Sequence, residues 1–130
     1  MNIKTYESGK IYIDNRIGFK IIFECYLKYS YHNSRSYTNN CDLILDLAKK
    51  EINELSKIKP YILNKVNNDM QLERLINSMF DNNLNITKTA KDVYMHRNTI
   101  NNKVDFIKDE TGLNLQVFKD AVAMYLLIKS

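Results

Sequence analysis

Seven polar side chains between residues 96 and 103 have the types that proteins use to contact nucleic acids. Arginine can pair with guanine through two N–H groups, asparagine can pair with adenine through two bonds, and threonine can contact a phosphate or a thymine methyl. None of the seven is acidic: they are His96, Arg97, Asn98, Thr99, Asn101, Asn102 and Lys103. This polar run, as we call these seven residues, offers contacts to base edges and phosphates.

The residues just before the polar run predict a short helix and a turn. Thr87 is a suitable N-cap, because its hydroxyl can accept a hydrogen bond from a free N–H group of the first helical turn. Residues 88–94 are then expected to be helical, with Ala90 and Val93 on one face. The small side chain of Ala90 lets a second helix cross closely. Met95 is expected to be the apolar residue buried in the turn.

A second helix is predicted to begin within residues 96–98. Ile100, Val104 and Ile107 recur at i, i+4 and i+7, which is the inward stripe of an amphipathic helix. The polar run then faces outward, and the helix N-terminus presents free N–H groups that suit phosphate. Two helices in this order indicate a helix-turn-helix whose second helix enters the major groove. The alternative is two amphipathic helices of a small bundle with a solvated polar face.

The segment resembles the C-terminal helix-turn-helix of PucR/CdaR-type transcription regulators, and also the DNA-binding end of Fis-like proteins. The family pattern has an Asn, a Thr-Ala pair, His-Arg-Asn-Thr-Leu, a basic-aromatic-basic triplet and Thr-Gly-Leu-Asp. The resemblance covers about residues 58–130. Its matching residues here are Asn85, Thr89-Ala90, His96-Arg97-Asn98-Thr99-Ile100, Asn101-Asn102-Lys103 and Thr111-Gly112-Leu113-Asn114.

The resemblance implies a sequence-specific regulator that binds double-stranded DNA. The triplet departs from the family pattern, because Asn and Lys replace its two Arg residues and Asn replaces its aromatic residue. Arg and Lys are not equivalent where a contact uses two parallel bonds, so the departure concerns affinity and the sequence that is bound. Arg97, Asn98 and Asn101 are assigned to base edges; the residues assigned to phosphates and positioning are Thr87, Lys88, Thr99, Asn102 and Lys103.

Charge adds little to the DNA interpretation. The 130-residue chain has a net charge of +4 and a pI of about 9.0. Residues 70–130 contain 8 Lys or Arg and 7 Asp or Glu, which gives only +1. The outward face must therefore supply the recognition locally. Weak non-specific attraction to phosphate also indicates that two copies bind together, as a homodimer.

Other classes of function have little support in the sequence. The chain has only three glycines, no phosphate-cradling loop, and no Ser/His/Asp or Cys/His set with workable spacing, so we expect no enzyme and no cofactor. Cys25 and Cys41 are not in a CxxC pattern, which argues against a metal site and leaves a disulfide as a minor alternative. The resemblance implies a bacterial protein. With no signal peptide and no apolar stretch of membrane-spanning length, we expect it in the cytoplasm without a membrane partner.

The expected fold is mainly all-α, a helical bundle with a C-terminal helix-turn-helix. Residues 10–14 alternate between polar and apolar, which predicts a short N-terminal strand or hairpin. Residues 16–31 predict an aromatic-rich helix, and residues 32–40 a polar loop. A helix over residues 42–58 should end before Pro60, because a proline pushes its predecessor out of helical geometry. Its inward stripe comprises Ile44, Leu47, Ala48, Glu51, Leu55 and Ile58.

The C-terminal half predicts three further features. A helix over residues 70–81 follows the capping residues 67–69, and Gly112 is expected to end the second helix of the helix-turn-helix in the left-handed conformation. A last helix over residues 116–128 contains eight consecutive apolar residues, which indicates burial in the core or in an oligomer. The buried residues expected elsewhere in this half are Leu72, Leu75, Ile76, Met79, Phe80, Leu113 and Leu115.

Two regions and two hypotheses follow. Residues 1–57 are predicted to form a helical dimerisation region, and residues 58–130 the helix-turn-helix domain. The leading hypothesis is a dimeric transcriptional regulator. The alternative is a small interaction or inhibitor module that keeps the fold but binds a protein partner through its aromatic N-terminal helix.

Overall fold

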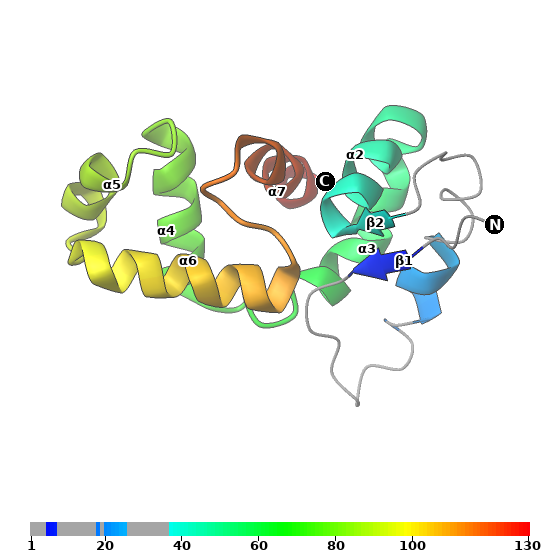
Figure 1. The fold of residues 1–130 in the computed structure, drawn as a ribbon, viewed down its shortest axis with the longest axis horizontal. Helices are drawn as coiled ribbons and strands as arrows, with labels where there is room; N and C mark the ends of the chain where they lie inside the picture. Colours follow the sequence, from blue (N-terminus) through cyan, green and yellow to red (C-terminus); the bar gives the residue numbers. More distant parts are fainter. Residues whose placement is uncertain (1–4, 8–17, 19, 26–36) are drawn as a thin grey trace.

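Helices make up most of the molecule. The structure, a computed structural model, describes residues 5–7, 18, 20–25 and 37–130. Figure 1 shows a helix pair and a crossing helix at one end, joined through the C-terminal helix to a second group of helices. The mainly all-α prediction is confirmed. The main helices are α2 (Asn40–Lys50), α3 (Leu55–Ile62), α4 (Met70–Asp81), α5 (Ile86–Val93), α6 (Arg97–Thr111) and α7 (Phe118–Lys129).

A two-stranded parallel sheet connects distant parts of the N-terminal region. Strand β1 (Thr5–Glu7) pairs with β2 (Tyr37–Asn39), with Thr5 opposite Tyr37. Because the pairing is parallel, these two strands are not a hairpin. The strand predicted at residues 10–14 lies outside the described residues. The predicted loop over residues 32–40 was wrong at its end, where β2 and the first residue of α2 lie.

The predicted aromatic-rich helix is described only in part. Residue 18 and residues 20–25 are helical, while the rest of the predicted range lies outside the described residues. Within this stretch Ile22 is buried in the core and Phe23 is 44% exposed.

The single helix predicted over residues 42–58 was wrong. Helix α2 ends at Lys50, a 3₁₀ turn covers Ile52–Glu54, and α3 follows directly. The break lies at Glu51, whose backbone angles (φ −148°, ψ 69°) are not helical. The predicted inward stripe nevertheless lies mostly inside, because Ile44, Leu47, Leu55 and Ile58 are fully buried, whereas Ala48 is half-buried and Glu51 is exposed.

Pro60 does not end a helix but lies inside α3, two residues before its end. A proline costs a helix one backbone hydrogen bond to the carbonyl four residues earlier. Here both Pro60 and Ser56, which carries that carbonyl, are exposed. Water can therefore satisfy the carbonyl, and the short helix continues for two more residues.

The C-terminal half follows its predictions closely. Helix α4 has the predicted bounds, and the Asp69 side chain caps it by accepting from the Leu72 N–H at 3.1 Å. Gly112 has φ 77°, the left-handed conformation that favours glycine. Helix α7 begins two residues later than predicted and ends one later. Of the expected buried residues, only Phe80 is half-buried; the fully enclosed ones are Leu72, Leu75, Ile76, Met79, Leu113 and Leu115.

Helix α7 packs against both α2 and α3. Polar bonds add to this contact. The Lys119 ammonium lies 3.2 Å from the Asp42 carboxylate, and Lys59 donates to the Ile128 carbonyl at 2.8 Å. A separate bond joins α2 to the end of α6, where the Asn40 side-chain amide donates to the Thr111 carbonyl at 2.7 Å. The division of the chain after residue 57 stays a prediction. Within the described residues, no helix is long and apolar enough to cross a membrane.

Candidate nucleic-acid interface

Helix α5 is capped by Asn85 and not, as predicted, by Thr87. The Asn85 side chain accepts from the Lys88 N–H at 3.0 Å, so Asn85 is the residue before the first helical turn. Ile86, which opens the helix, is half-buried against the core. Thr87 is therefore already helical and cannot cap. Thr87 and Lys88 are both exposed in the first turn of α5.

The turn between α5 and α6 reverses through a left-handed residue. Tyr94 has φ 55° and ψ 44°, and its N–H donates to the Ala90 carbonyl. Met95 also donates to that carbonyl, at 3.1 Å, and its side chain packs against the core as predicted. The Tyr94 ring is 89% exposed. Two backbone hydrogen bonds and the apolar contact of Met95 thus stabilise the turn that orients α6.

Helix α6 begins at Arg97, with His96 as its N-cap. The Nδ1 atom of His96 accepts from the Asn98 N–H at 3.1 Å, an arrangement that requires Nδ1 to be unprotonated. Ile100, Val104 and Ile107 are at most 1% exposed, so the predicted inward stripe is confirmed. The helix therefore presents its polar side away from the core.

The polar run lies on the outer side of α6, at its N-terminal half. His96, Arg97, Asn98, Thr99 and Asn102 are exposed. Asn101 and Lys103 are half-buried.

Two features limit the part of this face that could bind a polyanion. The Lys103 ammonium donates to the side-chain oxygen of Gln71 on α4 at 3.1 Å, a contact that the sequence analysis did not anticipate. Beyond Val104, the exposed side chains Asp105 and Asp109 are acidic. The surface that suits a polyanion is therefore confined to the first two turns of α6.

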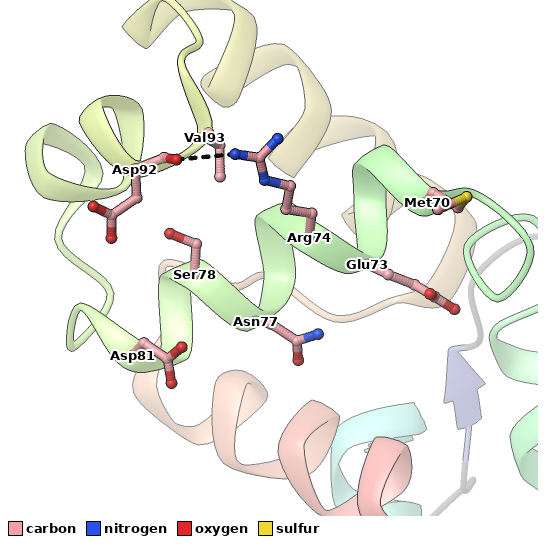
Figure 2. A pocket seen from close by; sticks show the side chains of 8 residues that line it. All are labelled: Met70, Glu73, Arg74, Asn77, Ser78, Asp81, Asp92 and Val93. Atoms are coloured by element: carbon pink, nitrogen blue, oxygen red, sulfur yellow. Dashed lines mark hydrogen bonds between the residues drawn. The ribbon is translucent and has the colours of Figure 1, made fainter.

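Helix α4 braces the helix-turn-helix from behind through polar bonds that the sequence analysis missed. Arg74 donates to the Asp92 carbonyl at 3.1 Å, and the two side chains flank a shallow polar groove between α4 and α5 (Figure 2). The Asn82 amide donates to the Asp92 carboxylate at 2.6 Å. These partners are 18 and 10 residues apart, so no helical or strand period pointed to them.

Neither cysteine forms a disulfide. Burial raises the pKa of the Cys41 thiol to about 12, and its hydrogen bond to the Asp120 carboxylate acts in the same direction. In the part of the chain that the structure describes, no group of three His, Cys, Asp or Glu side chains is arranged to hold a metal ion.

Comparisons with known proteins agree with the geometry of this region. Residues 72–130 match the PucR C-terminal helix-turn-helix domain. Members of this domain family are typically non-enzymatic regulators, and the match suggests DNA binding. This matched segment holds α5, α6, α7 and nearly all of α4. The resemblance predicted over about residues 58–130 is therefore confirmed, with the match beginning at residue 72.

Two Bacillus subtilis (strain 168) proteins are similar to this chain. YxkF, described as an uncharacterized protein, is 26% identical over 85 residues, which cover 65% of this chain and 28% of YxkF. YsfB, also described as uncharacterized, is 28% identical over 89 residues, which cover 67% of this chain and 24% of YsfB. The chain therefore matches about a quarter of the length of these relatives. No solved structure gives a significant match.

Proposed function

We propose that this chain is a sequence-specific DNA-binding transcriptional regulator. The match of residues 72–130 to the PucR C-terminal helix-turn-helix domain supports this proposal. In this proposal the first two turns of α6 enter the major groove of double-stranded DNA in the bacterial cytoplasm. The observation that carries it is the outward face of α6, where the exposed Arg97, Asn98 and Asn102 follow a helix N-terminus whose first turn contains no acidic residue. Such a face combines donors for base edges with N–H groups for phosphate.

The exposure of individual residues supports separate roles. Arg97 and Asn98 stand at the start of α6, where the recognition helix of a helix-turn-helix contacts bases. Asn101 lies one turn further on, and we assign all three to base edges. The residues proposed for phosphates and positioning are Thr87, Lys88, Thr99, Asn102 and Lys103. His96, the N-cap of α6, is proposed to lie next to the DNA backbone.

Lys103 has to exchange partners to reach DNA. In the free protein its ammonium bonds to the neutral amide of Gln71. A phosphate oxygen carries negative charge, so the lysine ammonium gains a direct charge–charge attraction there that the neutral Gln71 amide does not offer. Release from Gln71 is therefore favourable once DNA is close, and Gln71 holds the lysine near the position where it is needed.

We further propose that the regulator is a homodimer. An apolar groove of about 290 Å³ lies between α4 and α7, with Phe118 76% exposed and Tyr125 47% exposed at its edge. None of its lining residues carries a formal charge, and the Lys129 ammonium lies beside it, 5.6 Å from the centre of the Tyr125 ring. Two identical copies of the uncharged lining can therefore face one another, as a two-fold symmetric dimer requires. Two recognition helices about 34 Å apart would then read an inverted repeat.

The alternative function is a protein-interaction module. It is favoured by the same exposed apolar groove and by Phe23, which is 44% exposed on the described part of the N-terminal helix. In that case the helix-turn-helix fold would be retained without DNA binding.

Fluorescence anisotropy separates the two functions. The full chain is titrated against a random duplex and against genomic fragments that span its own promoter, at two salt concentrations. We expect tight, salt-dependent binding with one preferred fragment. Absence of binding at micromolar protein in low salt would contradict the proposal and favour the interaction module.

A further inference from the structure

The turn between α4 and α5 has a backbone that needs external support. Asn83 and Leu84 have φ values of 54° and 64°, two consecutive left-handed residues of which one is a bulky leucine. Such a conformation is unfavourable for side chains other than glycine, asparagine and aspartate. The Leu84 N–H donates to the Met79 carbonyl at 2.7 Å, and the leucine side chain packs against the core. The direction in which α5 leaves the turn depends on its packing against α4 and on the polar bonds near its last residues.

Asn82 and Asp92 connect the end of α4 to the end of α5. The Asn82 amide donates to the Asp92 carboxylate at 2.6 Å and to the Ser78 carbonyl and hydroxyl at 2.9 and 3.1 Å. Arg74 holds the same end of α5 by donating to the Asp92 carbonyl (Figure 2). Asp92 is the second-to-last residue of α5, immediately before the turn that leads to α6. A bond at this position therefore affects the direction in which the chain enters α6.

We propose that Asn82 and Asp92 are positioning residues, which set the angle between α4 and α5 and thereby the sequence discrimination of α6. The inference rests on the proposed DNA binding for its functional half. Neither residue is on the outward face of α6, and neither is proposed to touch DNA. Their bond lies at the surface, where a hydrogen bond contributes little to global stability. Its loss should therefore leave the domain folded while α5 and α6 sample a wider range of orientations.

The test is an exchange of the two side chains. Asn82→Asp places two carboxylates against one another, which breaks the bond by repulsion. Asn82→Asp combined with Asp92→Asn restores an amide-to-carboxylate bond in the reverse direction, at the charge of the natural chain, but not the bond to the Ser78 carbonyl. Asp92→Ala is therefore added, because it removes the partner of Asn82 and keeps both bonds to Ser78. Asn77→Asp is the matched control, because Asn77 is exposed on the same helix and the substitution has the same charge change.

Two measurements are made on each variant. Residual dipolar couplings of the ¹⁵N-labelled full chain, without DNA, report the angle between α4 and α5. Anisotropy reports the ratio of affinities for the preferred fragment and the random duplex. We expect Asn82→Asp to change the angle and to lower the ratio about tenfold, the double variant to restore both within about twofold, and Asn77→Asp to leave both unchanged.

The outcomes separate the two proposals. An unchanged angle in Asn82→Asp would overturn the positioning role, and so would a changed angle with an unchanged affinity ratio. An unchanged angle in Asp92→Ala would also overturn it, because this variant removes the carboxylate that Asn82 bonds to and keeps the bonds from Asn82 to Ser78. If the natural chain binds no duplex at all, the DNA proposal fails, and with it the positioning of a DNA-binding helix.

Discussion

Thr89 and Thr111 are both fully buried, but they differ in their bonding. The Thr111 hydroxyl donates to the Ile107 carbonyl at 2.7 Å and accepts from the Leu113 N–H at 3.1 Å. The Thr89 hydroxyl has no hydrogen-bond partner among the described residues. A buried hydroxyl without a partner costs free energy, whereas one with two partners stabilises the fold. The same residue type thus has opposite effects at the two positions.

Substitution by valine, which has the same shape, tests this difference. We expect Thr89→Val to raise the free energy of unfolding by about 1 kcal/mol, because only an unsatisfied hydroxyl is removed. Thr111→Val should lower it by about 1–3 kcal/mol, since the Leu113 N–H loses its acceptor. Urea denaturation followed by circular dichroism measures both. Equal changes in unfolding free energy, of the same sign in both variants, would contradict the different bonding assigned to the two hydroxyls.

The Cys41 thiol should be chemically inert in the folded protein. Its pKa is raised to about 12, mainly by burial, so very little thiolate exists near pH 8. In a Cys25→Ala variant, which leaves Cys41 as the remaining thiol, we expect no rapid reaction with Ellman's reagent until denaturant is added. Rapid labelling of the native variant would show that Cys41 is accessible and ionisable.

The same shift has a consequence for alkaline stability. The folded-state pKa of Cys41 lies above the ordinary thiol value of about 9, so the folded state retains the proton that the unfolded chain loses. This contribution to stability is complete below about pH 9 and is lost as pH rises toward 12. Cys41→Ala should therefore flatten the fall in unfolding free energy over this window, compared with Cys25→Ala.

At the scale of the element, periodicity predicted the helices well and their ends less well. The stripes of α4 and α6 repeat every three to four residues without competition from other patterns, and both helices begin and end close to prediction. The break at Glu51 could not be predicted from periodicity, because Leu47 and Leu55 are eight residues apart, a spacing that fits an uninterrupted helix. Both leucines are buried even though the backbone between them is not helical throughout.

The cap of α5 shows a similar limit. Asn85 and Thr87 both have side chains suited to capping, and the burial of Ile86 decides between them. We expect Asn85→Ala to lower the free energy of unfolding by about 1 kcal/mol, because the Lys88 N–H loses its acceptor. Thr87→Ala should be neutral or slightly stabilising, since alanine is the better helix former. A larger loss in Thr87→Ala would restore Thr87 as the cap.

At the scale of the molecule, the sequence predicted the outer face of α6 and a bracing helix over residues 70–81, but not the polar bonds that join this helix to α5 and α6. The polar run spans two helical turns around the buried Ile100, so the exposure of most of its residues follows from the helical period. The bonds of Arg74 and Asn82 to Asp92 on α5, and of Gln71 to Lys103 on α6, join residues that are 10 to 32 apart in sequence. The tertiary packing of α4 brings these partners together, and no local sequence period predicts it.

The proposed dimer is testable with a charged substitution. Light scattering at tens of micromolar should give a dimer, and Phe118→Lys should give a monomer with unchanged circular dichroism, because a buried ammonium opposes association. Met70→Lys is the control, since Met70 is 84% exposed outside the groove that Phe118 lines. A monomeric natural chain would contradict the dimer, and dissociation of both variants would move the interface away from this groove.

The central claim is that α6 reads base edges through Arg97. The most direct test is the affinity of Arg97→Ala for the preferred fragment and for the random duplex, measured by anisotropy over a range of salt beside Lys103→Ala. We expect Arg97→Ala to lose about 1–3 kcal/mol on the preferred fragment and to relax one base position. Lys103→Ala should weaken binding to both duplexes alike and lower the salt slope by about one unit. Equal losses on both duplexes for Arg97→Ala would contradict its role at a base edge.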